Sequence, residues 1–154
     1  MQPTEGLMEG FGDSDWARCV DTRHLTSGFV WIMGGGAICW RSKLQTIIAL
    51  SSTEAEYVGA TPAVQEIIWL RDLLCKLEIT DNSLSLLHMD NWGAISLTHG
   101  AGDSNQMKHI NIQYHYIWLH VECKHTKVQY LSTDEMTGYS YKKSQSYKAY
   151  LFHW

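Results

Sequence analysis

The chain has 154 residues, of which 45% are hydrophobic, and it contains seven Trp and eight Tyr, enough apolar mass for one folded core and too much for global disorder. Its net charge of −4 argues against a uniformly basic surface for nucleic acid, although basic residues can still be segregated on one face. The sequence shows no positively charged segment followed by the apolar segment of a signal peptide. The apolar run Gly28–Trp40 is too short and too rich in glycine to span a bilayer. We therefore expect an intracellular protein, in cytoplasm or nucleus, without membrane contact.

The first half of the chain predicts three strands and a long helix. A strand around Gly6–Asp13 is followed by a polar connection that runs through Ser27. Two further strands, 28–33 and 37–42, flank a triple glycine, which predicts a hairpin turn, since no helix with the Lys-Ser/Thr of a phosphate loop follows. A helix is expected from near Ser52 to about Leu77, with Pro62 either kinking it or splitting it in two.

The second half alternates strands and helices. Leu84–Met89 predicts a strand and Asn91–Thr98 a short helix, and a glycine-rich loop then leads to a helix near Asn105–Glu122. His125–Leu131 is the last clear strand. This succession indicates an α/β domain with a mixed sheet, without internal repeats or an interdomain linker.

Two glutamates at the start of the long helix have different predicted roles. Ser51 as N-cap places Glu54 at the third helical position, where it completes a capping box. Glu56 points about 200° away around the helix from Glu54 and begins the apolar stripe Ala60, Ala63, Ile67, Leu70 and Leu74. A carboxylate on a core-facing stripe is costly without a partner, and a bound metal ion is a common one. We predict Glu54 for the cap and Glu56 for chemistry.

Two aspartates at strand ends could meet Glu56. Asp13 follows a short apolar segment, and Asp90 lies between an apolar strand and a helix. Carboxylates gathered at one edge of a sheet form a hard oxygen site that suits Mg²⁺. The alternative is that Asp13 and Asp90 serve as turn or cap residues.

The cysteines and histidines offer weaker alternatives. Four cysteines are scattered without a Cys-x-x-Cys pair, so reduced thiols are expected. A denser group could suggest a zinc-binding interaction domain, but it lacks a second paired-ligand unit of familiar spacing. The members of this group are His109, His115, His120, Cys123 and His125.

The ordered motifs of the chain resemble the ribonuclease H domain of Ty1/copia-type retrotransposon Pol polyproteins. Each motif is unspecific by itself, and their combination in this order is very specific. The motifs are FGDSDWA at 11–17, DTRHLTSGFV at 21–30, GGGAICWRSK at 34–43, ALSSTEAEY at 49–57, IWLR at 68–71, MDN at 89–91, KHINIQYH at 108–115 and YLSTDEM at 130–136.

The resemblance implies a ribonuclease H-like fold, a five-stranded mixed sheet flanked by helices, over residues 1–136. It also implies an enzyme that cuts RNA in RNA–DNA hybrids with two divalent ions about 4 Å apart, Mg²⁺ or Mn²⁺, held by four acids. Three of these acids match Asp13, Glu56 and Asp90. Within such a polyprotein the domain would originally have accompanied reverse transcriptase and integrase. Lys108, His109 and Tyr114 are family-typical, and either helix docking or contact with the hybrid would account for them.

The resemblance ends after Met136, where residues 137–154 form a divergent tail in place of the family's last helix. Tyr139 occupies the position of the fourth acid, and a neutral phenol cannot replace an anionic metal ligand. Asp134 or Glu135 is an alternative source of that charge. The sequence therefore predicts a two-ion site that is incomplete and an impaired hydrolase, or a catalytically inactive remnant that acts as a nucleic-acid-binding or interaction module.

Overall fold

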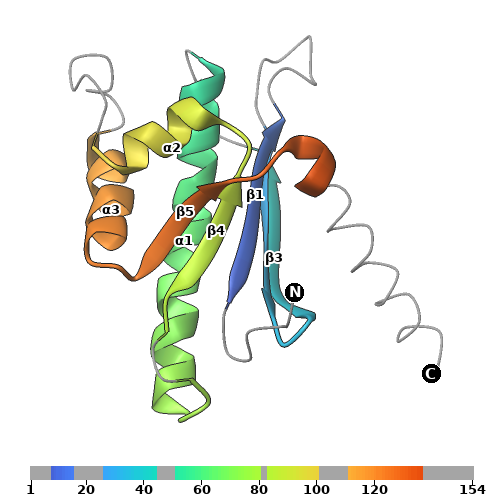
Figure 1. Ribbon diagram of the computed structural model, residues 1–154, viewed down its shortest axis with the longest axis vertical. Helices are drawn as coiled ribbons and strands as arrows, with labels where there is room; N and C mark the ends of the chain where they lie inside the picture. The colour runs from blue at the N-terminus through green and yellow to red at the C-terminus, as the bar shows by residue number, and fades with distance from the viewer. Residues whose placement is uncertain (1–7, 16–25, 45–50, 81–82, 101–110, 137–154) are drawn as a thin grey trace, which may run out of the picture.

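The computed structural model describes residues 8–15, 26–44, 51–80, 83–100 and 111–136, and Figure 1 shows their arrangement. The five strands form one sheet in the order β3-β2-β1-β4-β5. β1 pairs antiparallel with β2, and β2 pairs antiparallel with β3, whereas β4 is parallel to both β1 and β5. The predicted five-stranded mixed sheet is thus confirmed. The strands are β1 (Glu9–Asp15), β2 (Thr26–Met33), β3 (Gly36–Leu44), β4 (Ser85–Met89) and β5 (Thr126–Tyr130).

The triple glycine makes the predicted hairpin turn between β2 and β3. Gly34 and Gly35 have φ values of 58° and 83°, in the left-handed region that residues with a Cβ rarely adopt. A Cβ at either position would meet no atom within 4 Å, so the need for glycine at this turn comes from the backbone conformation rather than from packing.

Three helices lie on one side of the sheet in Figure 1: α1 (Ser52–Lys76), α2 (Trp92–Thr98) and α3 (Asn111–Glu122). α1 is a single helix that runs through Pro62, so the alternative in which this proline splits it is wrong. The predicted helix start near Asn105 lies outside the described residues.

The main core lies between α1 and the sheet. Trp31 of β2 is fully buried there, and its indole Nε1 donates a hydrogen bond of 3.0 Å to the carbonyl oxygen of Ala63. This bond joins the sheet to the middle of α1. Because the apolar stripe of α1 is buried in the same cluster, the helix is held both along its length and in rotation about its axis.

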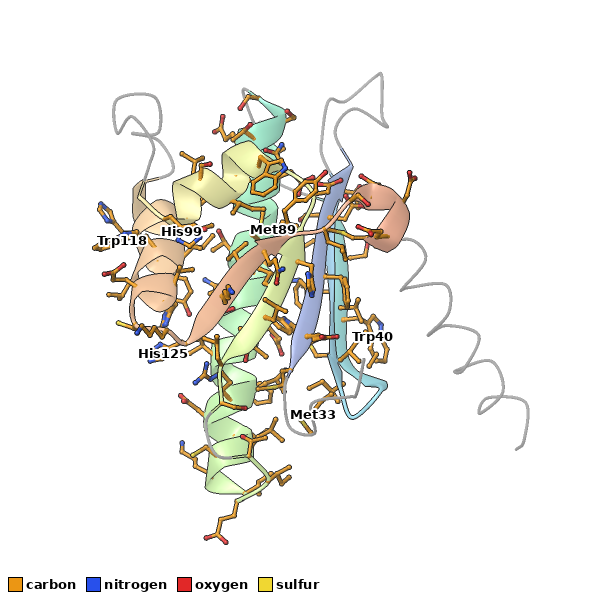
Figure 2. All side chains as sticks on the ribbon, in the orientation of Figure 1. Met33, Trp40, Met89, His99, Trp118 and His125 are labelled. Atoms are coloured by element: carbon orange, nitrogen blue, oxygen red, sulfur yellow. The ribbon has the colours of Figure 1, made fainter. Side chains whose placement is uncertain are left out.

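The opposite face of the sheet carries a smaller apolar cluster around Phe11, Ile32 and Met136. Met136 comes from one helical turn at residues 133–136, which lies apart from the other helices in Figure 1. Trp40 of β3 lies beside this cluster and is 72% exposed (Figure 2). No helix among the described residues has the length and apolarity that crossing a bilayer requires.

Candidate metal centre

The parallel pairing of β1 with β4 brings Asp13 and Asp90 together. Phe11 is paired with His88 in this ladder, so two residues further along both strands Asp13 comes opposite Asp90. Asp90 is the first residue after β4, and Asp13 lies near the end of β1. The two carboxylates therefore share the edge of the sheet at which both strands end.

Glu56 reaches this edge from the first turns of α1. Ser51 is the N-cap of this helix: its backbone is extended, and its Oγ accepts a hydrogen bond of 3.1 Å from the amide of Glu54. The predicted N-cap is thereby confirmed. Both glutamates are buried, each with 7% of its surface exposed. The burial of Glu56 was expected from the stripe that it begins, but the burial of Glu54 was not.

Asp13, Glu56 and Asp90 form one compact acidic group. Each offers a carboxylate oxygen that lies within 4.8 Å of the others, with Glu56 buried, Asp90 half-buried and Asp13 exposed. Two unit charges about 4 Å apart repel by about 1 kcal/mol in water and about 4 kcal/mol at the effective dielectric of a protein surface. Divalent cations relieve this repulsion, and carboxylate oxygens are the ligands that Mg²⁺ prefers. The predicted convergence is present, and the role of these three residues as metal ligands remains a prediction.

Close packing of two helix N-termini holds Glu56 near Asp90. Asn91 caps α2, because its Oδ1 accepts a hydrogen bond of 3.0 Å from the amide of Ala94. Thr53 of α1 donates to the same Oδ1 at 3.5 Å. A Cβ at Gly93 would lie only 2.8 Å from Thr53 Oγ1, so glycine permits this approach of α2 to α1.

Thr133 also contacts the acidic group, which the sequence did not predict. Its hydroxyl donates a hydrogen bond of 2.6 Å to Asp90 Oδ2, from the helical turn that follows β5. That turn begins with a capping box in which the Ser132 hydroxyl donates to Glu135 Oε2 at 2.9 Å and accepts from the Glu135 amide at 3.4 Å. The pattern Ser-x-x-Glu at 132–135 is the signal that could have indicated the turn.

The capping box also bears on the fourth acid. Glu135 is engaged with Ser132, and neither Glu135 nor Asp134 belongs to the acidic group. Their use as substitute ligands is therefore not seen. Tyr139 and the rest of the predicted tail lie outside the described residues, as do Lys108 and His109, and the side chain of Tyr114 lies outside them too.

Two histidines of the zinc alternative, His120 and His125, form a hydrogen-bonded pair. His120 Nδ1 and His125 Nδ1 lie 2.9 Å apart, a hydrogen bond in which one ring donates and the other accepts. Burial lowers the pKa of His120, and the charges of His125 and Arg71 lower it further, against an opposing effect of Asp72. Over the part of the chain that the structure describes, the acidic group is the only set of three or more potential metal ligands close together.

The chain is similar in sequence to plant retrotransposon proteins. It is 36% identical over 132 residues to the retrovirus-related Pol polyprotein from transposon TNT 1-94 of Nicotiana tabacum, a match that covers 86% of the chain and 10% of the relative. It is 32% identical over 143 residues to that from transposon RE2 of Arabidopsis thaliana, covering 93% of the chain. The chain thus spans about a tenth of the length of these curated relatives. No protein-family model matches it.

The fold is similar to that of solved ribonucleases H. LC11-RNase H1, isolated from compost by a metagenomic approach, superimposes with a TM-score of 0.60 at 14% identity, covering 88% of this chain and 91% of that one. The same enzyme in complex with an RNA/DNA hybrid gives a TM-score of 0.54 at 13% identity, covering 83% and 87%. Because identity this low supports the fold alone, the structural neighbours indicate the fold, and the sequence relatives indicate the family. The chain is thus homologous to a segment of Ty1/copia-type retrovirus-related Pol polyproteins, and it has the fold of ribonuclease H domains.

Proposed function

We propose that the chain is a metal-dependent ribonuclease H-like domain that binds RNA–DNA hybrid and hydrolyses its RNA strand, with activity impaired by loss of the fourth acid. The observation that carries this proposal is the convergence of Asp13, Glu56 and Asp90 within 4.8 Å of one another. The hybrid bound by a structural neighbour of the same fold supports the choice of substrate.

Each residue of the site has a limited task in this proposal. Asp13, Glu56 and Asp90 hold divalent ions, Mg²⁺ or Mn²⁺, which when bound supply an activated water and stabilise the leaving 3′ oxygen. Thr133 fixes the orientation of the Asp90 carboxylate through its hydrogen bond. No side chain acts as a nucleophile, because water attacks the phosphate. Tyr139 contributes no charge at neutral pH, so the second ion is held more weakly.

The polyprotein origin of the relatives supports a wider proposal about context. We propose that this segment derives from a longer chain in which it acted beside reverse transcriptase and integrase segments. A product of reverse transcription is an RNA–DNA hybrid, so the reverse transcriptase segment of the same polyprotein would produce the substrate of this domain.

Metal binding is testable without catalysis. Addition of Mg²⁺ should raise the melting temperature, since a ligand at 100 times its Kd stabilises the native state by about 2.7 kcal/mol, or roughly 5–10 °C for a domain of this size. Asp13→Asn should abolish this shift while leaving the metal-free protein at least as stable, because it removes one of three repelling charges. Asp72→Asn, which changes an exposed acid on α1, is the matched control and should keep the shift. An equal shift in both variants would contradict the metal site.

Cleavage of a labelled RNA–DNA hybrid in Mg²⁺ or Mn²⁺ then tests the chemistry. Native cleavage that Glu56→Gln abolishes would mean that three acids suffice. A native chain that is silent and is activated by Tyr139→Asp would place the defect at one ligand. If no variant cleaves but the hybrid still binds, the second candidate function, a catalytically inactive binding module, is correct. The tyrosine at the position of the fourth acid is the observation that favours this second candidate.

A further inference from the structure

Two aromatic rings stack beside the acidic group. Trp92, the first residue of α2, and Tyr130, the last residue of β5, have ring centroids 4.6 Å apart and an interplanar angle of 11°. Trp92 is nevertheless 65% exposed. One face of its indole thus lies on Tyr130 while the other remains open, although a large aromatic ring normally gains free energy by burying both.

A groove of about 500 Å³ runs between α2 and β5 next to this stack. Its walls are apolar at Ile95 and Val128 and carry polar groups at Ser96, His99 and Gln129. His99 lies at the end of α2 in Figure 2. Among the described residues, no carboxylate and no lysine or arginine lines the groove. Such a lining suits a flat heterocycle with hydrogen-bonding edges better than it suits a phosphate, which needs cationic partners.

The groove begins two residues along the chain from the candidate metal centre, because Trp92 lines it and Asp90 belongs to the acidic group. Asp90, Asn91 and Trp92 are consecutive, so the Cα atoms of Asp90 and Trp92 are at most about 7.6 Å apart. That span corresponds to about two nucleotide steps along one strand of a duplex. Tyr130 is held at the same place, since the amide of the next residue, Leu131, donates a hydrogen bond of 2.9 Å to the carbonyl oxygen of Met89.

We propose that the groove beside Trp92 and Tyr130 binds one unpaired nucleobase that flanks the hybrid held at the metal centre. Bases inside a duplex are already stacked on both faces, whereas an unpaired base can be splayed out onto an aromatic side chain. The open face of Trp92 provides the stacking surface, and Ser96 and Gln129 provide polar partners for the edge of the base. The inference rests on the proposed function, because the acidic group has to hold the hybrid.

The test compares blunt hybrids with hybrids that carry a single-stranded overhang of three nucleotides, on each strand and at each end, with 2-aminopurine in the overhang. Binding is measured in Ca²⁺. One base stacked on an aromatic side chain contributes about 1–3 kcal/mol, so one overhang polarity should bind at least about fivefold more tightly than the blunt duplex. The 2-aminopurine fluorescence should be quenched in the same complex.

Trp92→Ala should remove both the added affinity and the quenching while leaving blunt-hybrid affinity unchanged, and Trp92→Phe should restore part of each. The matched control is Trp69→Ala, which removes an exposed indole of α1 and should change neither. If the blunt hybrid binds and no overhang binds better, this inference is overturned and the proposed function stands. Equal loss of blunt and overhang binding in Trp92→Ala would also overturn it, in favour of a duplex contact. If no hybrid binds at all, the proposed function fails as well.

Discussion

A methyl group added at Gly10 would test how tightly the sheet packs beneath α1. Gly10 of β1 pairs with Trp31 of β2, and the indole lies across the space that a side chain would fill. A Cβ at Gly10 would lie 2.6 Å from Cε3 and Cζ3 and 2.7 Å from Cη2 of Trp31. Non-bonded carbon atoms normally approach to about 3.5–4.0 Å, so the ring would have to move by about 1 Å.

Any displacement of the Trp31 indole costs free energy. It is fully buried, and its hydrogen bond to the carbonyl oxygen of Ala63 would lengthen with any displacement. Overpacking of a core typically costs about 1–3 kcal/mol, and loss of one hydrogen bond adds about 1 kcal/mol. We expect Gly10→Ala to lower the free energy of unfolding by about 2–4 kcal/mol, a large share of the stability of an ordinary domain.

Urea denaturation measures this effect as a midpoint shift of roughly 1 M or more at an unchanged slope. The control is Gly12→Ala in the same strand, where the nearest atom to the new Cβ is Leu87 Cδ1 at 3.8 Å, an ordinary contact. That variant should be neutral or slightly stabilising. In a Trp31→Phe background, which lacks the second ring, Gly10→Ala should cost less by about 1 kcal/mol or more. Equal stability of the Gly10 and Gly12 variants would refute the packing argument.

Three further predictions concern the metal centre and the histidine pair. Gly93→Ala should push α2 away from Thr53 and weaken the thermal shift produced by Mg²⁺, and an unchanged shift would contradict the role given to this contact. Thr133→Val should lower metal affinity by about 10–100-fold in a titration, whereas Thr133→Ser should not, because only the valine lacks the hydroxyl that bonds Asp90. Because the pKa of His120 is lowered in the folded protein, the unfolded chain binds more protons than the folded chain once the pH falls below about 6.5. The free energy of unfolding should therefore decline between pH 7.5 and pH 5.5. His120→Gln should flatten that decline in urea denaturation, and an equally steep decline would show that other groups cause it.

Local features of this protein were predictable because each depends on a few neighbouring residues. Ser51 caps α1 as expected, since an N-cap needs only one hydroxyl and the amide three residues later. The Gly34-Gly35 turn followed in the same way from backbone sterics. The stripe that starts at Glu56 predicted which side of α1 is buried. Of the two alternatives expected for Pro62, a kink or a split, the split does not occur.

The three acids could be named from motifs, but their meeting point depends on the ladder between β1 and β4. Asp13 and Asp90 are brought opposite each other by the parallel register, which no local pattern specifies. Whether they bind metal is still a prediction, and Tyr139 and residues 137–154 lie outside the described residues. The burial of Glu54 was missed because the capping motif alone accounts for its position in the sequence.

Composition, periodicity and ordered motifs were thus enough to establish the class of fold, the family and the three candidate ligands. The order of the strands, the hydrogen bond from Thr133 to Asp90, the stack of Trp92 on Tyr130 and the indole of Trp31 above Gly10 were decided only by the tertiary structure. The physical reason is that caps, turns and amphipathic stripes depend on interactions within a few residues. Contacts between distant residues depend instead on register and close packing, where a shift of one residue or of about 1 Å changes the partner.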